Sequence, residues 1–449
     1  MKFVIIGGDA AGMSAASRAR RLDPQIEVMV LEQTLDVSYS ACGMPYNIAD
    51  AKRSIEDLVV RRAEVFRQKQ GIDLRTGRCV ERIDPASGTV SGSDTNGQPF
   101  QEAYDQLLIA TGAAALRPDL PGFSLPGVMV LKSLDQGRRI KTFLKERSVR
   151  QVVIIGMGYV ALEMAESLRA LGIGVAMVKP RPAFLPWMPE EMARLVLDEV
   201  HANDVRTHAG QAVTSIEMTA GTRPSLTVHC EQTDLAADMV LVAVGVSPNS
   251  ALAAAAGLEL SVGRSIAVDR RMRTSAANIY AAGDCADAYH VVSGRKTWIP
   301  LALRANRAGW AVADNVCGKL TELQGVAGTA VFRVFGLQVA RTGLTEREAR
   351  TCGFEPVPVV IKTRSRAHAH PGASDIWVHM LADKPSGRLL GVQMVGREGV
   401  AHRINAPAVA LHNGMTVEQY AQCDLAYAPP FGPTWDPTLT AANQILKKL

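Results

Sequence analysis

A single cysteine, Cys42, stands in a short segment whose residue types could carry redox chemistry. The segment Ser38–Tyr46 reads Ser-Tyr-Ser-Ala-Cys-Gly-Met-Pro-Tyr, and its Gly43 and Pro45 predict a tight turn or the opening of a helix. A thiolate at such a turn has a lowered pKa and is reactive, so one interpretation is an electron relay beside a redox cofactor. The alternative is a small buried side chain, which a free cysteine usually is. The flanking elements favour the relay.

The elements that would position this thiol begin with a dinucleotide-binding pattern at the N-terminus. An apolar run at 3–6 leads into the glycine turn Gly7–Gly12, a helical stretch at 13–21 and a second apolar run that ends in Glu32. This is the strand, glycine turn, helix, strand and acid of a βαβ unit, in which the acid binds a ribose hydroxyl. The turn departs from G-x-G-x-x-G at Asp9, where the strict pattern has glycine.

The same pattern recurs in the middle of the chain. A strand expected at 152–155 precedes the turn Gly156-Met-Gly158-Tyr-Val-Ala, and a helix at 163–171 and a strand at 175–178 follow. The turn is the permitted variant G-x-G-x-x-A. Two such units in one chain predict two dinucleotides, and the usual pair is a flavin and a nicotinamide nucleotide.

The residues after the second unit bear on the choice of nicotinamide nucleotide. Lys179 stands where an acid would bind the 2′-hydroxyl, and Arg181 follows two residues later. Cations at this place suit a 2′-phosphate, so we expect NADPH rather than NADH. The alternative is that Lys179 points into solvent and either nucleotide binds.

Three further segments each join an apolar strand to a small-residue turn. They are 105–112, which ends in Thr111 and Gly112; 240–249, which contains Gly245; and 279–287, which contains Gly283 and Asp284. We expect the last segment to open a helix. The Asp284 carboxylate could accept a hydrogen bond from a flavin ribityl hydroxyl or simply cap that helix. A helix at 300–313, which includes Ala302, could direct its N-terminal dipole at a flavin ring.

From residue 328 the pattern changes to that of an α+β domain without a nucleotide turn. Strands are expected at 329–339, 356–362, 376–381 and 389–395, and helices at 345–352 and 405–413. The segment 424–437 is rich in aromatic residues and prolines, which suggests a fixed loop. It could dock onto a second subunit or pack against its own chain.

Composition excludes several classes of protein. The chain has 449 residues and a net charge of +5, and no run of like charges or aromatic-basic platform suggests nucleic-acid binding. Its seven cysteines are scattered, which argues against a disulfide scaffold or a zinc site and fits a reducing cytoplasm. No 18-residue apolar segment predicts a membrane span, and the N-terminal apolar run is too short for a signal peptide.

Over its whole length the chain resembles the FAD- and pyridine nucleotide-dependent disulfide oxidoreductases. The resemblance implies an α/β fold with two Rossmann-like domains and a C-terminal α+β dimerisation domain, a glutathione reductase-like architecture. The FAD domain would comprise 1–115 and 246–325, the NAD(P)H domain 116–245 and the dimerisation domain 326–449. The residues expected to bind the cofactors are Gly7, Gly12, Glu32, Ser38, Thr111, Gly112, Gly156, Gly158, Lys179, Arg181, Gly245, Gly283, Asp284 and Ala302.

Within that superfamily the cysteine segment resembles the single-cysteine branch. Val37 and Asn47 stand where a second cysteine of a C-x-x-x-x-C pair would be, so the paired-cysteine enzymes are excluded. The single-cysteine branch contains coenzyme A-disulfide reductases, persulfide or polysulfide reductases, NADH oxidases and NADH peroxidases. The oxidases and peroxidases resemble one another in a histidine within the first glycine turn, where this chain has Ala10.

The C-terminal segment resembles that of the coenzyme A-disulfide reductases. The run from Tyr427 to Pro437 matches their Tyr-Ala-Pro-Pro motif, whose tyrosine in the family reaches the cysteine of the partner subunit. Two residues depart from the pattern: His370 replaces a tyrosine, and Ala41 replaces a frequent asparagine. Both departures put the identity of the disulfide substrate in question.

The resemblance implies a homodimeric enzyme that contains FAD and binds NADPH or NADH. Electrons would pass from the nicotinamide through the flavin to Cys42, which reduces a disulfide or persulfide, foremost coenzyme A disulfide or that of a related small thiol. Tyr427 or His370 would protonate the leaving thiolate; no metal is expected. One alternative is an oxidase or peroxidase that acts on oxygen or peroxide. Another is a flavin electron-transfer protein for a protein partner.

Overall fold

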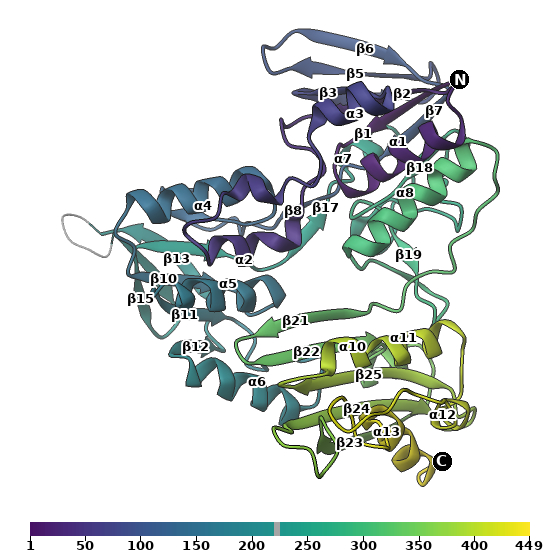
Figure 1. Cartoon of the computed structure of the whole chain (residues 1–449). Coiled ribbons are helices and arrows are strands. Elements are labelled where there is room, and N and C mark those ends of the chain that lie inside the picture. The colour runs from purple at the N-terminus through teal and green to yellow at the C-terminus, as the bar shows by residue number, and fades with distance from the viewer. Residues whose placement is uncertain (220–224) are drawn as a thin grey trace.

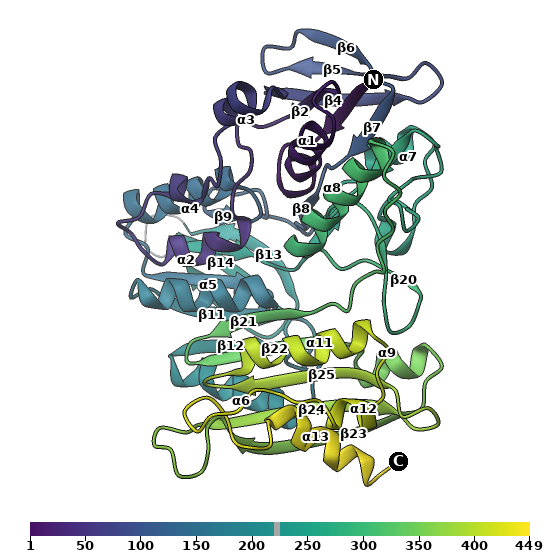
Figure 2. The ribbon, with the colours of Figure 1, turned by 45° about the vertical axis from the view of Figure 1, so that its right-hand side comes forward.

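The computed structural model describes residues 1–219 and 225–449, and its first sheet gathers strands from two distant parts of the chain. The sheet and its helices comprise β1 (Lys2–Ile6), α1 (Ala10–Leu22), β2 (Glu27–Glu32), α3 (Ala63–Gln70), β3 (Asp73–Thr76), β7 (Gln106–Ile109), β18 (Ile279–Ala281) and α8 (Ala302–Val316). The strand order is β18-β7-β1-β2-β3, and every pairing is parallel. Helices α1 and α8 lie side by side (Figures 1 and 2). Their backbones touch at Gly309, where a Cβ would lie 2.2 Å from the carbonyl oxygen of Ala11.

Smaller elements surround this sheet. They comprise a three-stranded antiparallel sheet, a short antiparallel strand pair and a short helix. They are β4 (Arg78–Asp84), β5 (Thr89–Asp94), β6 (Pro99–Ala103), α7 (Ala251–Ala255), β19 (Ala288–Tyr289) and β20 (Lys296–Thr297).

The second parallel sheet belongs to the middle of the chain. Its elements are β9 (Val128–Met129), α4 (Leu134–Glu146), β10 (Gln151–Ile155), α5 (Tyr159–Ala170), β11 (Gly174–Lys179), α6 (Glu190–Ala202), β12 (Val205–Ala209) and β16 (Met239–Val242). The order β12-β11-β10-β16-β9 places β10 at the centre, as β1 is in the first sheet. Each glycine turn therefore follows a central strand. An antiparallel sheet covers one side and consists of β13 (Val213–Met218), β14 (Leu226–Cys230) and β15 (Asp234–Ala237).

A narrow ribbon joins the two parallel sheets. Strand β8 (Ala113–Ala115) pairs antiparallel with β17 (Val246–Pro248), so the chain leaves the first sheet and returns to it at the same place. The predicted domain boundaries at 115/116 and 245/246 fall on this ribbon.

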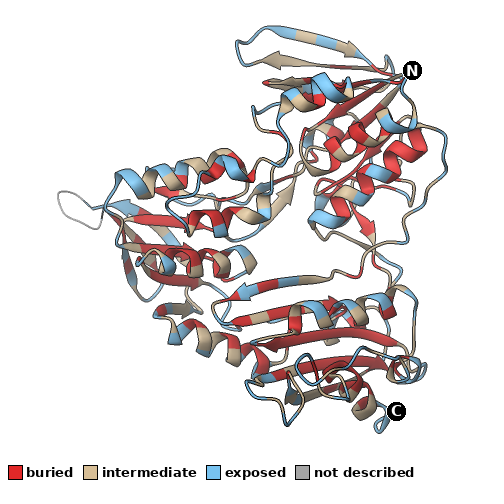
Figure 3. Ribbon diagram, viewed as in Figure 1, coloured by how far each residue is buried: buried red, intermediate tan, exposed pale blue. Residues whose placement is uncertain are grey.

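The third unit is an antiparallel sheet covered by helices. Its elements are β21 (Ala330–Val334), β22 (Leu337–Gly343), α9 (Glu346–Thr351), β23 (Pro356–Arg364), β24 (Asp375–Asp383), β25 (Leu389–Gly396), α10 (Val400–Arg403), α11 (Asn405–His412), α12 (Val417–Ala421) and α13 (Pro437–Leu446). The strand order is β21-β22-β25-β24-β23. Buried residues are concentrated along the strands of the large sheets (Figure 3). The predicted fold class, two Rossmann-like units and a C-terminal α+β unit, is confirmed.

One predicted strand is in fact a hairpin. The sequence predicted a single strand at 329–339, but the chain reverses at Phe335 and Gly336 between β21 and β22. Two carboxylates from the second unit hold this turn: Glu166 of α5 accepts the Phe335 N–H (2.8 Å), and Glu199 of α6 accepts the Gly336 N–H (2.9 Å). The hairpin therefore joins the C-terminal unit to the second one. In the described residues no helix is long and apolar enough to cross a membrane.

Candidate functional site

Cys42 lies at the start of a short helical segment beside the first glycine turn. It is the middle residue of a 3-10 turn (Ala41–Gly43) that runs into α2 (Met44–Ile48), which confirms the predicted turn that opens a helix. Ser38 bends the chain toward this turn with a positive φ of 49°. Its N–H donates to the carbonyl oxygen of Gly8 (3.1 Å), so the cysteine segment is tied to the glycine turn. Cys42 itself is exposed, unlike a packing residue.

The pKa of the Cys42 thiol is raised, and the predicted lowering is wrong. Removal of water by the surrounding protein is the main cause, and the carboxylate of Glu163 adds to it. The ammonium group of Lys132 acts in the opposite direction. A turn at a helix start therefore does not by itself activate this sulfur. Removal of water and the surrounding charges together set how much thiolate forms.

Glu163 connects the cysteine segment to the second unit. It lies on α5 and accepts a hydrogen bond from the hydroxyl of Tyr46 in α2 (2.8 Å). Burial raises the pKa of Glu163. The guanidinium of Arg333, in the C-terminal unit, lies 5.9 Å from the centre of the Tyr46 ring. Residues from all three units therefore meet at Tyr46, four residues after Cys42.

Helix α4 anchors the cysteine segment from the other side. The Lys141 ammonium group lies within hydrogen-bond distance of oxygens of Asn47, Asp50 and Arg53, at the carboxyl end of α2 (2.7–2.9 Å). One turn earlier, Arg138 makes two hydrogen bonds to the carboxylate of Asp36 and two to that of Glu56, all between 2.6 and 2.9 Å. Two cations of one helix thus hold the segment at both ends.

Asp284 lies in a turn and not at the start of a helix. Gly283 and Asp284 follow β18 directly, and the next helix, α8, begins only at Ala302, so the predicted helix opening at 283–284 and the capping role are wrong. The Asp284 carboxylate instead pairs with Lys132 at 2.9 Å. Lys132 also lowers the pKa of both Cys42 and Asp9, so one cation lies among three groups of the first unit.

The first glycine turn fits a bound dinucleotide. A Cβ at Gly12 would lie 1.9 Å from the carbonyl oxygen of Gly7, so only glycine allows α1 to start this close to the strand. The Glu32 carboxylate accepts the Gly8 N–H (2.7 Å) and lies at the end of β2, where an acid can receive a ribose hydroxyl. Ala302 is the exposed first residue of α8. Together, the glycine cradle, the acid and the helix N-terminus suit FAD.

The second glycine turn leaves room for another nucleotide. Gly156 and Gly158 directly precede α5. No atom outside the neighbouring residues lies within 4 Å of a Cβ placed on Gly158. Lys179 closes β11, and its ammonium group donates to the carbonyl oxygen of Ala183. Arg181 is exposed next to it, and burial together with this neighbouring cation lowers the pKa of Lys179. Two cations therefore lie at the end of β11.

The small-residue turns at 111–112 and 245 lie at the ribbon between the sheets. The hydroxyl of Thr111 donates to the carbonyl oxygen of Asn249 (2.6 Å), and the Asn249 N–H donates to that of Gly112 (3.0 Å). On the other strand, the carbonyl oxygen of Gly245 accepts the N–H of Leu116 (2.9 Å). These hydrogen bonds hold the two strands of the ribbon together. Any motion between the two nucleotide-binding units would occur about this ribbon.

His370 and Tyr427 lie in two segments that contact each other, away from Cys42 of their own chain. His370 is in the loop between β23 and β24, and this loop joins the C-terminal segment through the Ala367 N–H and the carbonyl oxygen of Pro429 (3.1 Å). The sheet of the C-terminal unit separates this loop from α2 (Figure 1). A single chain therefore does not bring all three predicted catalytic residues together.

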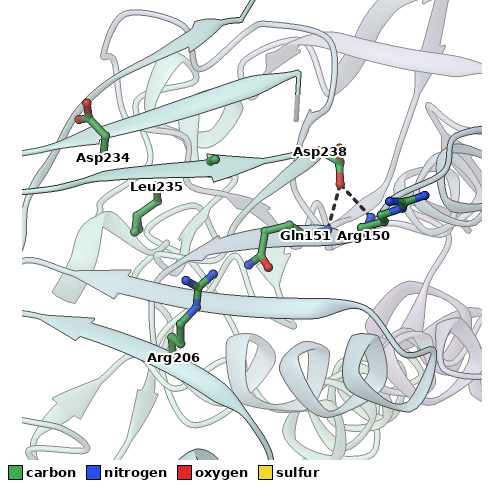
Figure 4. Close-up of a pocket in the computed structure, with 7 residues that line it drawn as sticks. Arg150, Gln151, Arg206, Asp234, Leu235 and Asp238 are labelled. Atoms are coloured by element: carbon green, nitrogen blue, oxygen red, sulfur yellow. Dashed lines mark hydrogen bonds between the residues drawn. The ribbon is translucent and has the colours of Figure 1, made fainter. Parts of the chain in front are cut away.

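A cavity of about 420 Å³ in the second unit is not part of this site. It lies at the opposite end of the second sheet from its glycine turn, between the starts of β10 and β12 and the strand β15 (Figure 4). Asp238 closes one end through hydrogen bonds to the N–H groups of Arg150 (2.8 Å) and Gln151 (2.9 Å).

Comparison with known proteins identifies the family. Residues 1–309 match the family described as pyridine nucleotide-disulphide oxidoreductase, and residues 329–437 match the dimerisation domain of that family. The chain belongs to the pyridine nucleotide-disulphide oxidoreductases. It is accordingly a flavoprotein oxidoreductase that uses FAD and NAD(P)H, and it forms a homodimer.

Three proteins show which oxidoreductases the chain is similar to. The NAD(P)H coenzyme A polysulfide/persulfide reductase of Pyrococcus horikoshii is 36% identical over 98% of each chain. The NADH oxidase of Methanocaldococcus jannaschii is 32% identical over 100% of this chain and 99% of that protein. The crystal structure of reduced Bacillus anthracis CoADR-RHD is 32% identical and has a TM-score of 0.95. The match covers 99% of this chain and 80% of that chain.

Sequence reasoning missed four residues that lie around Cys42 or hold its helix α2. Lys132, Lys141 and Glu163 come from the second unit, and Tyr46, although inside the cysteine segment, was given no partner. The start of α4 could have been found, because Ser133 and Gln136 form a capping box in the sequence pattern Ser-x-x-Gln. Lys132 contacts a residue 152 positions away and Lys141 contacts residues 88–94 positions away, so neither contact leaves a local signal.

Proposed function

We propose that this oxidoreductase reduces a disulfide or persulfide of a small thiol, foremost of the coenzyme A type, at Cys42. The observation that carries the proposal is one exposed thiol beside a dinucleotide cradle, with all seven cysteines of the chain free. Bound FAD and NAD(P)H supply the electrons. A single cysteine suffices because the substrate brings the second sulfur: the Cys42 thiolate attacks the substrate sulfur and a thiolate leaves. The relative named as a coenzyme A polysulfide/persulfide reductase supports this substrate class.

The residues around the thiol would control its charge. Lys132 favours the thiolate and Glu163 opposes it. The hydrogen bond from Tyr46 fixes the Glu163 carboxylate. We infer that this group of residues releases and returns the proton of Cys42 during turnover.

Tyr427 and His370 are proposed to act on Cys42 of the partner subunit. Tyr427 is 49% exposed, and Phe431 and Trp435 of the same segment are 79% and 60% exposed. Large apolar side chains at such exposure favour a segment that packs onto another surface. In a two-fold dimer each subunit would then supply one proton donor for the leaving thiolate of the other.

NADPH is the proposed nicotinamide nucleotide. Lys179 and Arg181 form a basic pair at the end of β11, where the sequence has no acid for a 2′-hydroxyl. Lys179 would exchange its present bond with the Ala183 carbonyl oxygen for one with the 2′-phosphate.

Reduction of the bound flavin by NADPH without oxygen, followed by mixing with candidate oxidants, tests the proposed function. Coenzyme A disulfide, polysulfide, hydrogen peroxide and oxygen are compared in the same preparation. We expect reoxidation to be fastest with a sulfur substrate. Fastest reoxidation by oxygen or peroxide would instead assign the oxidase function, in line with the similarity to an NADH oxidase. Equal and slow reaction with all four would favour a protein partner.

A further inference from the structure

One residue of the first glycine turn has no role in the function proposed above. Asp9 stands where the strict dinucleotide pattern has glycine, and that glycine lets the backbone approach the pyrophosphate. An aspartate there places a carboxyl group at the point that the most highly charged part of FAD must approach. The structure shows how this chain accommodates it.

The Asp9 carboxyl does not serve the helix that it precedes. Asp9 has the backbone position of the N-cap of α1, and its carbonyl oxygen accepts the Met13 N–H (2.9 Å), but its side chain makes no capping hydrogen bond. Instead Oδ1 accepts the N–H of Tyr39 (3.3 Å), three residues before Cys42. The carboxyl therefore reaches from the glycine turn to the cysteine segment, and the backbone N–H of Ala10, at the start of α1, also favours its ionised form.

Charged groups on every side act on this carboxyl. Glu32, from the end of β2, disfavours its ionised form, and Lys132, from the segment before α4, favours it. Tyr39 faces it from the cysteine segment, and Asp9 in turn helps to raise the pKa of that phenol. Burial is the largest influence and raises the pKa of Asp9 to about 6. The carboxyl thus titrates near pH 6 before any ligand adds charge.

A bound dinucleotide would disfavour the ionised form of the Asp9 carboxyl further. Its pyrophosphate is anionic and binds at the N-terminus of α1, beside the carboxyl. Two anions in a partly buried site repel each other strongly, and protonation of the carboxyl removes the repulsion. We propose that FAD binding is coupled to proton uptake at Asp9, so that this residue makes cofactor retention depend on pH. The inference requires only FAD at this turn and not the identity of the substrate.

The direction and size of the effect follow from linkage. Because the protonated form binds FAD better, affinity increases as the pH falls and decreases as it rises above the titration of free Asp9. If FAD binding takes up one proton, each pH unit of increase in that range weakens binding by up to about tenfold. Replacement of the carboxyl by a neutral group removes the dependence and strengthens binding at alkaline pH.

The test measures FAD affinity of the full-length dimer between pH 6 and 9 by the change in flavin fluorescence. The variants are Asp9→Asn, a neutral isostere, and Asp9→Gly, which restores the pattern. Asp23→Asn is the matched control, because Asp23 lies at the other end of α1. We expect the dissociation constant of the wild type and the control to rise by about tenfold per pH unit above neutrality. Both Asp9 variants should show a flat profile and bind more tightly at pH 8.

A wild-type profile without slope would overturn the proposal, and so would an Asp9→Asn profile as steep as that of the wild type. The wild-type slope needs no variant, so the proposal stays testable if one variant does not fold. Where binding is too tight to titrate, the rate of FAD release on dilution at each pH replaces the dissociation constant. Loss of reductase activity with an unchanged pH dependence of FAD binding would bear on the proposed function alone.

Discussion

Replacement of Lys141 by methionine should loosen the cysteine segment without unfolding the protein. Methionine keeps a long unbranched side chain but removes the ammonium group that lies among the oxygens of Asn47, Asp50 and Arg53. A hydrogen bond to a charged group contributes about 1.5–3 kcal/mol. Lys141 is partly exposed and water replaces some of its contacts, so we expect a net loss of about 2 kcal/mol in the stability of α2. Local opening should then increase about 30-fold.

Amide hydrogen exchange of a peptide that covers residues 43–53 measures this opening directly. The N–H of Ala49, which donates to the carbonyl oxygen of Pro45, reports on α2 itself. Lys145→Met is the matched control, because Lys145 lies on the exposed side of the same helix. Exchange in the Lys141 variant within twofold of the wild type would refute the anchoring role. Equal acceleration in both variants would show that α4, and not the ammonium group, is responsible.

Three further changes test the thiol and the nucleotide site. Cys42→Ser should retain FAD and lose disulfide or persulfide reduction almost completely, because a hydroxyl is a poor nucleophile; the long-wavelength thiolate–flavin absorption of the reduced enzyme should vanish with it. Glu163→Gln should lower the pKa of Cys42, so alkylation of Cys42, followed by mass spectrometry, should reach half its maximal rate at lower pH. Lys179→Glu should equalise or reverse the preference for NADPH over NADH in anaerobic flavin reduction; an unchanged ratio would place Lys179 away from the 2′-phosphate.

The repeated βαβ units could be predicted because their signals are local. An apolar run, a glycine turn and a terminal acid or cation lie within about thirty residues, and tertiary contacts do not alter them. The hairpin at 330–343 could not be predicted in the same way. Apolar residues continue through its turn, and Phe335 adopts a left-handed conformation with φ 50° that nothing nearby in the sequence indicates. The carboxylates of Glu166 and Glu199, which hold that turn, come from helices more than one hundred residues earlier.

The candidate site likewise has features that follow from neighbouring residues and features that depend on the fold. The position of Cys42 in a turn that opens a helix follows from Gly43 and Pro45, which are its neighbours. Its partners Lys132 and Glu163 do not, because the segment before α4 and helix α5 bring them to the thiol through the fold of the second unit. Asp284 was found as a polar residue at the end of a strand, but its ion pair with Lys132 needed the structure.

This division explains why the predicted pKa of Cys42 had the wrong direction. The prediction treated the acidity of the thiol as a property of its own turn, whereas in the structure it depends first on removal of water and then on charged groups that include Glu163 and Lys132 of the unit with the second glycine turn. The ribbon of β8 and β17 links that unit to the first, and Tyr46 bonds Glu163 across the same boundary. A shift of Glu163 away from the sulfur would lower the pKa of Cys42, and a shift of Lys132 away would raise it. The nicotinamide-binding unit would therefore control the charge of the thiol as well as deliver the electrons that reach it.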